Sequence, residues 1–213
     1  MTSPLEPVVF IVDDDDAVRQ FICGLLASVH LKAEAFSCAQ QFLDAYDANR
    51  PGCLLLDIRM PGMSGLELQQ ELRSRGIDVP IVVLTGHANV QVAVRAMQMG
   101  AVDFIEKPFN NELLLARVQK AVAASLRAHG ERTARRRIEA RLASLTPRER
   151  QVLDRVVVGE KNKLIANQLN ISEKTVELHR ANLMEKMKAG SLAQLIRMMV
   201  GPSTGGGSAP AKT

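Results

Sequence analysis

Carboxylate, hydroxyl and ammonium side chains follow the ends of several short apolar runs in the first half of the chain. They are, in chain order, Asp13, Asp14, Asp57, Thr85 and Lys107. If the apolar runs are parallel strands of one sheet, the residues just past their carboxyl ends meet at one edge. Three carboxylates that meet repel each other unless a cation lies among them, and an oxygen-only site with few ligands suits Mg²⁺. The spacing therefore predicts a magnesium site with an ammonium beside it.

Asp57 is the residue of this set that is best placed to react. A carboxylate beside Mg²⁺ can attack a phosphoryl group in line, while the metal and an ammonium offset the charge that spreads over the phosphoryl oxygens. Asp57 ends the apolar run Leu54–Leu56, which fixes its position. We expect Lys107 to pair with one phosphoryl oxygen and Thr85 to donate a hydrogen bond to another. Each of these residues alone is more often part of a turn, so the hypothesis depends on their common register.

The elements that would position these residues alternate along the first 126 residues, as βαβ units do. The predicted strands are Val8–Val12, Ala33–Phe36, Cys53–Asp57, Pro80–Leu84 and Val102–Ile105. The predicted helices are Ala17–Ser28, Ala39–Ala48, Leu66–Ser74, Val90–Met99 and Asn111–Leu126. Gly76 and Gly100 are placed as C-terminal stops, and Asp15 and Asp16 begin the first helix, where they complement its dipole. An α/β fold with a parallel sheet between two helical layers follows.

Residues 127–143 are predicted to form a helical linker, because Ala, Glu and Arg dominate and no Pro or Gly follows Gly130. The linker is rich in arginine, with Arg135–Arg137 in a row. A solvated face that only spaces two domains explains these arginines as well as a function does. Residues 201–213 consist mainly of Gly, Ser, Pro and Ala, have no large apolar residue and are predicted to be disordered.

Residues 144–200 are predicted to form an all-helical domain. A capping box of Thr146 and Glu149, with Pro147 at the first helical position, begins its first helix. A tight turn at Asn170 and Ile171 then joins two helices, which is the layout of a helix-turn-helix. The later helices are expected at Lys163–Leu169, Ser172–Met187 and Leu192–Met199.

The second helix of this pair is expected to enter the major groove of DNA. Its exposed positions mix donors and acceptors, as base readout requires, and the lysines that flank it suit phosphates. The candidate DNA-binding residues are Lys161, Lys163, Lys174, Thr175, Glu177, His179, Arg180, Asn182 and Lys186. Leu178, Leu183 and Met187 are expected to form its inward stripe. Taken singly, the charges on this helix would be read as a solvated face.

Charge is divided unevenly along the 213 residues. Residues 1–120 carry 10 Lys and Arg against 15 Asp and Glu, net −5, whereas residues 121–213 carry 17 against 8, net +9. An acidic first half suits a cation or a basic partner, and a basic second half suits a polyanion such as DNA.

Two classes of protein are disfavoured by the sequence. No apolar run reaches the ~18 residues that a membrane span needs. The three cysteines have no CxxC spacing, which argues against a disulfide framework or a zinc knuckle. We therefore expect a cytoplasmic protein with no membrane partner.

The motifs of the first half resemble the receiver domain of two-component response regulators. The match is carried by VDDDDAVR, LLLDIRMPGMSGLEL, VVLTGHANV and AVDFIEKPF, in order and spacing, over about residues 8–126. The resemblance implies a flavodoxin-like (βα)5 fold of strand order 2-1-3-4-5, phosphorylation by a sensor histidine kinase, and a cis bond before Pro108. The implied phosphorylation site is Asp57, and the implied Mg²⁺ ligands are Asp14, Asp57, the backbone carbonyl of Arg59 and, through water, Asp13. The implied phosphoryl-binding and switch residues are Thr85, Phe104 and Lys107.

Residues 144–200 resemble the LuxR-type four-helix DNA-binding domain of the NarL/FixJ class. The match is carried by LTPRERQVLDRVVVGEKNKLIANQLNISEKTVELHRANLMEKM. It implies that the helix Leu192–Met199 pairs two copies over a two-fold DNA site. One departure is the pair Glu160 and Lys161, which is charged where the family often has smaller or apolar residues; it would alter a backbone contact but not the fold.

Together the two resemblances imply a transcription regulator that is switched by phosphorylation of Asp57. Its implied cofactor is Mg²⁺, and its implied partners are a sensor histidine kinase, double-stranded DNA, RNA polymerase and, on phosphorylation, a second copy of the chain. It would be no enzyme beyond assisting its own phosphorylation and dephosphorylation. A Mg²⁺-dependent phosphatase would need a second carboxylate two residues after Asp57, where Arg59 stands. An interaction adaptor that never meets DNA is disfavoured by the basic helix-turn-helix.

Overall fold

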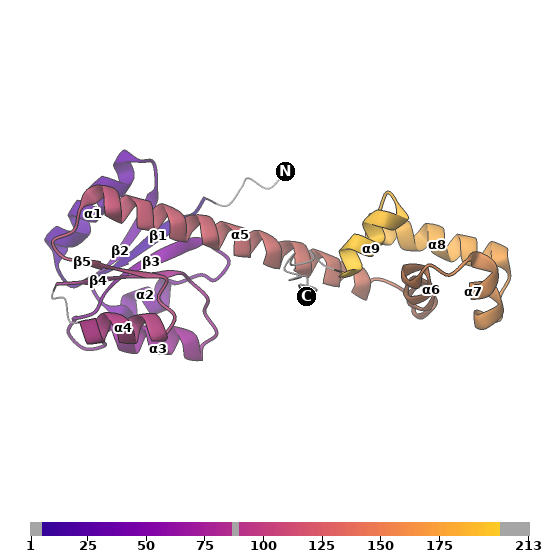
Figure 1. Cartoon of the computed structure of the whole chain (residues 1–213), viewed down its shortest axis with the longest axis horizontal. Helices are drawn as coiled ribbons and strands as arrows, with labels where there is room; N and C mark the ends of the chain where they lie inside the picture. The colour runs from indigo at the N-terminus through magenta and orange to yellow at the C-terminus, as the bar shows by residue number, and fades with distance from the viewer. Residues whose placement is uncertain (1–5, 87–89, 201–213) are drawn as a thin grey trace, which may run out of the picture. The chain divides into compact units, whose positions relative to one another are not determined.

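The computed structural model of the chain describes residues 6–86 and 90–200. The chain divides into two compact units, Met1–Glu131 and Arg132–Thr213. Helix α5, Asn111–Ala143, contributes residues to both units (Figure 1). The predicted fifth helix and the predicted helical linker therefore form one continuous helix. The tail predicted to be disordered, residues 201–213, lies outside the described residues.

A five-stranded parallel sheet forms the centre of the first unit. Its strands are β1 Val8–Val12, β2 Lys32–Phe36, β3 Gly52–Asp57, β4 Ile81–Thr85 and β5 Asp103–Glu106. Their order is β2-β1-β3-β4-β5, which confirms the flavodoxin-like arrangement. β1 matches its predicted bounds, and each of the other strands is displaced by one residue at one or both ends. β1 and β3 are buried along their whole length, as expected of strands between two helical layers.

Helices cover both faces of this sheet (Figure 1). On one face lie α1, Asp16–Ser28, and the first part of α5; on the other lie α2 Ala39–Ala45, α3 Gly65–Ser74 and α4 Val90–Gln98. The alternation along β1 separates the two layers, since Ile11 packs with Ile22 of α1 and Leu114 of α5. Phe10 packs on the opposite face with Phe42 of α2. The strand ends are thereby fixed from both sides, which positions the residues that follow them.

Helix α2 ends at Ala45, three residues before the predicted end at Ala48. Tyr46 leaves the helical region, with φ −69° and ψ 126°. Its ring centroid lies 5.6 Å from that of Phe10 and 5.3 Å from that of Phe42. Packing of this ring on the core therefore outweighs the local preference for another helical turn.

The cysteines of the chain are free thiols, as the spacing predicted. Cys53 is buried in β3, and burial raises the pKa of its thiol to about 12. Cys23 and Cys38 are only half-buried. No helix within residues 6–86 and 90–200 is long and apolar enough to span a membrane.

The described part of the second unit is all-helical. After the end of α5 come α6 Pro147–Val158, α7 Asn162–Leu169, α8 Glu173–Met187 and α9 Leu192–Val200 (Figure 1). The predicted capping box is confirmed, because the Thr146 hydroxyl accepts from the Glu149 amide at 3.3 Å and the Thr146 amide donates to Glu149 Oε2 at 2.8 Å. Helix α6 ends at Gly159, whose φ of 92° lies in the left-handed region that glycine adopts readily.

The core of the second unit draws on all four of these helices. Its fully buried large side chains include Val152, Leu153, Ile165, Val176, Leu183, Met187 and Leu195. The prediction that Leu178 belongs to the inward stripe of α8 was wrong, because its side chain is 61% exposed. Val176, Leu183 and Met187 share one face, whereas Leu178 lies two positions from Val176 and so about 200° away around the helix. Leu178 therefore faces solvent on the helix that was expected to read DNA.

An ion pair joins α6 to α8. Glu149 is only 3% exposed and accepts a hydrogen bond from Lys186 Nζ at 2.7 Å. The hydrogen bond from Lys186, followed by the one from the Thr146 amide, lowers the pKa of the Glu149 carboxyl. A carboxyl whose pKa is lowered on folding contributes stability above its unfolded pKa and loses that contribution as the pH falls through its folded pKa.

Glu149→Gln is accordingly expected to lower the free energy of unfolding of the second unit by about 1–2 kcal/mol at neutral pH. The loss should shrink as the pH falls below about 4, the ordinary pKa of a glutamate, and should vanish once the pH is below the lowered pKa of the folded state, where the carboxyl is protonated in both states. Urea unfolding of the full chain at several pH values checks this. Glu139→Gln is the matched control, since Glu139 forms an exposed pair with Arg135 that is worth only about 0.5 kcal/mol. A loss for Glu149→Gln that is as large in acid as at neutral pH would contradict this assignment.

Candidate functional sites

The carboxyl ends of β1, β3 and β5 bring together three of the charged residues singled out above. Lys107 Nζ donates to Asp13 Oδ2 at 2.6 Å and to Asp57 Oδ1 at 2.7 Å. Asp13 is fully buried and Asp57 is 6% exposed, whereas the Lys107 side chain is 19% exposed. Two carboxylates and one ammonium thus form a nearly buried, hydrogen-bonded cluster at the sheet edge, as predicted.

The loop after β3 fixes the orientation of Asp57. The Arg59 amide donates to Asp57 Oδ2 at 2.6 Å, and the Gly65 amide donates to the Ile58 carbonyl at 2.9 Å. A Cβ atom at Gly65 would lie 2.1 Å from the Asp57 carbonyl oxygen, so the start of α3 can approach this backbone only because residue 65 is glycine. The Asp57 carboxylate is therefore held by its own loop on one oxygen and by Lys107 on the other.

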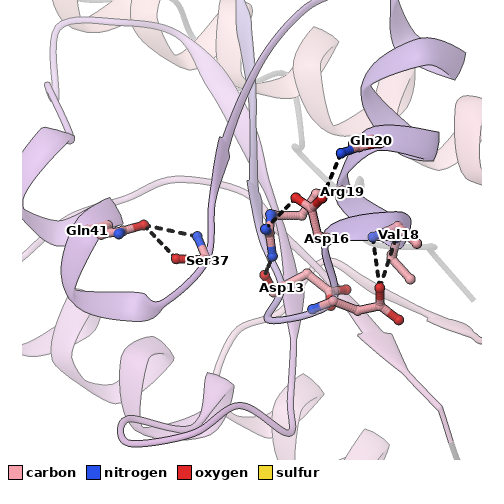
Figure 2. Close-up of polar contacts among 9 residues, drawn as sticks. Asp13, Asp16, Val18, Arg19, Gln20, Ser37 and Gln41 are labelled. Atoms are coloured by element: carbon pink, nitrogen blue, oxygen red, sulfur yellow. Dashed lines mark hydrogen bonds and ion pairs between the residues drawn. The ribbon is translucent and has the colours of Figure 1, made fainter.

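Helix α1 holds Asp13 in place (Figure 2). The Asp15 amide donates to Asp13 Oδ1 at 3.1 Å, and Arg19 Nη1 donates to the Asp13 carbonyl oxygen at 2.7 Å. Arg19 Nη2 also pairs with Asp16 Oδ1 at 2.7 Å, and Gln20 donates to the second oxygen of Asp16 at 2.6 Å. Asp15 caps α1 and Asp16 lies in its first turn, as predicted. The role of Arg19 was not foreseen, although this residue stands in the motif VDDDDAVR.

A cleft of about 390 Å³ opens beside this part of α1 (Figure 2). It is lined by Asp16, Arg19, Gln20, Cys23, Ala35, Ser37 and Gln41. Its polar groups bond one another on each side of the cleft: Arg19 and Gln20 donate to Asp16 on α1, and the Ser37 amide and hydroxyl both donate to Gln41 Oε1 at 3.0 Å. Neither Asp57 nor Lys107 lines it, so the cleft is separate from the acidic cluster.

The cluster shifts the pKa values of its members. Burial raises the pKa of Asp57, and the nearby Asp13 charge adds to this, while hydrogen bonds from Lys107 and the Arg59 amide oppose it. Burial alone would lower the pKa of Lys107, but its hydrogen bonds to Asp13 and Asp57 outweigh that effect and leave its pKa raised. Lys107 therefore remains an ammonium, which is the state needed to offset negative charge on a phosphoryl group.

The other residues predicted for this site lie around the cluster. Thr85 is buried at the end of β4, and its carbonyl accepts from the Lys107 amide at 2.7 Å. Phe104 lies on the neighbouring strand β5, where its side chain is 47% exposed. Asp14 and Arg59 are exposed beside the buried pair. The peptide bond between Lys107 and Pro108 is cis, as the resemblance implied.

The donor set of this edge fits Mg²⁺. The ligands on offer are oxygens only, from the carboxylates of Asp13, Asp14 and Asp57 and from the Arg59 carbonyl, and Mg²⁺ prefers oxygen ligands and keeps several waters. No cluster of three or more His, Cys, Asp or Glu side chains in the described ranges is arranged to hold a metal by itself. A backbone oxygen and water would therefore have to complete the coordination.

The predicted DNA-binding residues lie on or next to α7 and α8 and divide into three groups. Lys161, Lys163, Lys174 and Glu177 are exposed, and so is Leu178, which was predicted to face the core. Arg180 and Lys186 are instead engaged inside the unit, because Arg180 donates to Asn162 Oδ1 at 3.1 Å and Lys186 pairs with Glu149. The half-buried remainder comprises Thr175, His179 and Asn182. The outward groups near the start of α8 are thus the ones open to a DNA groove.

Comparisons with known proteins agree with both halves of this description. Residues 9–119 match the response regulator receiver domain, and residues 143–199 match the luxR family of bacterial regulatory proteins. The chain is 47% identical over 190 residues to the transcriptional regulatory protein FixJ of Azorhizobium caulinodans, covering 89% of this chain and 90% of that protein. It is 42% identical over 193 residues to the response regulator protein TodT of Pseudomonas putida, covering 90% and 84% respectively.

A solved structure of a response regulator matches most of the chain. The response regulator StyR aligns with a TM-score of 0.86 and 41% identity, covering 92% of this chain and 98% of that one. Receiver domains of this kind generally bind Mg²⁺ at the phosphorylation site. Because the receiver family matches the first part of the chain and the luxR family matches the second, the chain belongs to the transcriptional response regulators that join a receiver domain to a LuxR-type DNA-binding domain.

Proposed function

We propose that a sensor histidine kinase phosphorylates this response regulator on Asp57, with Mg²⁺ bound beside it, and that the phosphorylated chain dimerises and binds specific DNA sites in the cytoplasm. RNA polymerase is the further partner through which such a regulator would act. The observation that carries the proposal is the Lys107 ammonium held between Asp13 and Asp57. It places a nucleophile, a metal ligand and a positive charge in one hydrogen-bonded cluster, as phosphoryl transfer requires.

Asp57 would be the nucleophile in the phosphoryl transfer. One of its carboxylate oxygens bonds to phosphorus, and the bond from phosphorus to the donor histidine nitrogen breaks. That nitrogen keeps the electron pair, and the other ring nitrogen carries the proton, so a neutral imidazole leaves. Mg²⁺, when bound, would neutralise charge on the phosphoryl oxygens; Asp14, Asp57 and the Arg59 carbonyl, with Asp13 through water, would hold it. Lys107 would exchange its contact with Asp57 for one with a phosphoryl oxygen. The Arg59 amide restrains rotation of the Asp57 carboxylate during the attack.

The switch from phosphorylation to DNA binding would pass through Thr85 and Phe104. We expect Thr85 to move toward the new oxygens and Phe104, now 47% exposed, to turn inward beside it. The change would remodel the surface of α4, β5 and α5, which already exposes the apolar side chains Val94, Met97 and Val102. An apolar surface of this kind supports a docking role for a second receiver.

Sedimentation of the full chain tests the dimer switch. Without phosphorylation we expect a monomer, and with acetyl phosphate and Mg²⁺, or with a phosphoryl mimic, a dimer. The same treatment should leave Asp57→Asn monomeric. A chain that is dimeric in both states would remove the switch but leave phosphorylation of Asp57 open to a separate test by acid-labile labelling.

The enzymatic alternative lacks a necessary group. A phosphatase with an aspartate nucleophile needs a second acid/base carboxylate two residues further on, and Arg59 stands there. We therefore infer that the chain assists only its own phosphorylation and dephosphorylation. Incubation with acetyl phosphate should give a long-lived adduct, whereas rapid steady release of phosphate would favour the enzyme.

Leu178→Ala is expected to lower affinity for the cognate DNA site by about 1 kcal/mol, because an exposed leucine on α8 can contact a thymine methyl group. Stability should stay unchanged, since the side chain is not part of the core. Arg180→Ala is the comparison, because it also loses the hydrogen bond to Asn162 and should reduce both affinity and stability. Binding arrays that score every base position, together with thermal unfolding, separate the two. An unchanged base preference in Leu178→Ala would show that this side chain does not read a base.

A further inference from the structure

The arginine-rich end of α5 is built into the second unit. Ile138 and Leu142 pack against the core that holds α6 and α8. Arg141 Nη1 donates to the carbonyl oxygen of Met187, the last residue of α8, at 3.1 Å. This stretch of α5 is therefore fixed next to the C-terminal end of the helix expected to read DNA, and its side chains are presented from a set position.

The opposite side of this stretch is strongly basic. Residues 127–143 contain six arginines and two glutamates. Arg136 lies about 160° around the helix from Ile138, and Arg132, one turn earlier, lies about 120° from it; Arg137 lies about 100° from Ile138, whereas Arg135 lies only about 60° from it. All four are exposed. Arg135 forms an exposed pair with Glu139 at 3.0 Å, which is worth only about 0.5 kcal/mol and can be exchanged for another partner.

A helix that serves only as a spacer does not need this charge. Helical spacers stay soluble with balanced acidic and basic side chains, as i,i+4 pairs of opposite charge also support the helix. Here like charges stand side by side, which costs helix stability rather than adding to it. An unbalanced basic face held on a DNA-binding unit is complementary to a polyanion.

We infer that the face of α5 that carries Arg132, Arg136 and Arg137 is a second DNA-contact surface, which binds backbone phosphates beside the site read by α8. The inference rests on the proposed function only in that α8 must dock on DNA. Guanidinium groups pair with phosphate oxygens without reading bases, so this surface adds affinity and salt dependence but no sequence preference. It lengthens the footprint of each copy on the duplex.

The test compares the full chain with the double variant Arg136→Gln, Arg137→Gln after treatment with acetyl phosphate and Mg²⁺. The probe is double-stranded DNA of mixed sequence, and the observable is the slope of log Kobs against log salt concentration. Each lost phosphate contact should make the slope shallower by about 0.9, so the double variant should lose about 1.8. Glutamine keeps the helix, because its helix propensity is close to that of arginine. The matched control is Arg73→Gln, Arg75→Gln, which removes two exposed charges from α3 of the receiver.

The expected result is a shallower slope for the α5 variant and a wild-type slope for the α3 control. Wild-type binding with the same slope in the α5 variant would overturn this inference alone. An equal change in both variants would also overturn it, since it would reflect net charge rather than a contact. A wild-type chain that does not bind DNA at all would overturn both the inference and the proposed function.

Discussion

Asp57→Asn should give a folded chain that takes up no phosphoryl group. The amide nitrogen of asparagine is a poor nucleophile, and the neutral side chain binds Mg²⁺ weakly. The cost to folding should be small, because asparagine keeps an oxygen for the Arg59 amide, now 2.6 Å from Asp57 Oδ2. The neutral side chain also avoids the cost of burying a charge, which is the main cause of the raised pKa of Asp57 and offsets the lost attraction to Lys107. Labelling with acetyl phosphate, followed by acid-labile phosphate analysis, measures the effect.

The matched control for this variant is Asp44→Asn. Asp44 is an exposed carboxylate on α2 that accepts a hydrogen bond from Gln40 at 2.7 Å and lies in no cluster with Lys107. It should be labelled at the wild-type rate. Wild-type labelling of Asp57→Asn would place the nucleophile at another residue.

Gly65→Ala should damage both the fold of the receiver and its phosphorylation. The added Cβ atom would lie 2.1 Å from the Asp57 carbonyl oxygen, and backbone cannot give way as a flexible side chain can. Relief requires α3 to move away or the loop after Asp57 to shift, at a cost of about 3 kcal/mol in unfolding free energy. A displaced carboxylate should also react more slowly, by about 10²-fold for a shift near 1 Å. Urea unfolding and the rate of labelling by acetyl phosphate measure the two effects.

Gly24→Ala is the control for this substitution. Gly24 lies inside α1, and a Cβ atom there would meet no other atom within 4 Å. Alanine has the higher helix propensity, so this variant should be more stable by up to about 1 kcal/mol and should be labelled normally. If Gly65→Ala were as stable as the wild type, the close approach of α3 to Asp57 would not constrain the loop.

The parts of this molecule that could be predicted from sequence follow from simple periodicity. Asp13, Asp57 and Lys107 were expected to meet because each follows an apolar strand, and parallel strands share a carboxyl edge. The capping box of Thr146 and Glu149 is equally local, since all of its hydrogen bonds lie within one turn. Neither feature depends on how distant helices pack.

Features that depend on packing between helices were not predicted. The side of α8 that faces the core was assigned wrongly, because Leu178 and Val176 are both apolar and the sequence does not tell them apart. Only packing against α6 and α7 decides that Val176, and not Leu178, is buried. The pairs Lys186–Glu149 and Arg180–Asn162 join residues 37 and 18 positions apart in the chain. No spacing rule marks such partners, so two side chains proposed to bind DNA proved to be engaged within their own unit.

The contact between Arg19 and Asp13 is an intermediate case. The two residues are only six positions apart, but the acceptor is the carbonyl oxygen of Asp13, which directly follows β1, and the donor lies on the next helix. A signal was present in the motif, as an arginine one turn after Asp15 and Asp16 is well placed to turn back toward a strand end. Side-chain to backbone contacts of this kind carry no apolar period and are easily overlooked.

The most direct test of the central claim is the DNA affinity of the full chain before and after phosphorylation, with Asp57→Asn measured in parallel at the same salt concentration. If phosphorylation of Asp57 joins two receivers, the second DNA-binding unit is held near a two-fold site and affinity rises without a new base contact, by about 10²-fold. The account predicts that rise for the wild type and its absence for Asp57→Asn. Equal affinity of the wild type in both states, or an equal rise in Asp57→Asn, would contradict it.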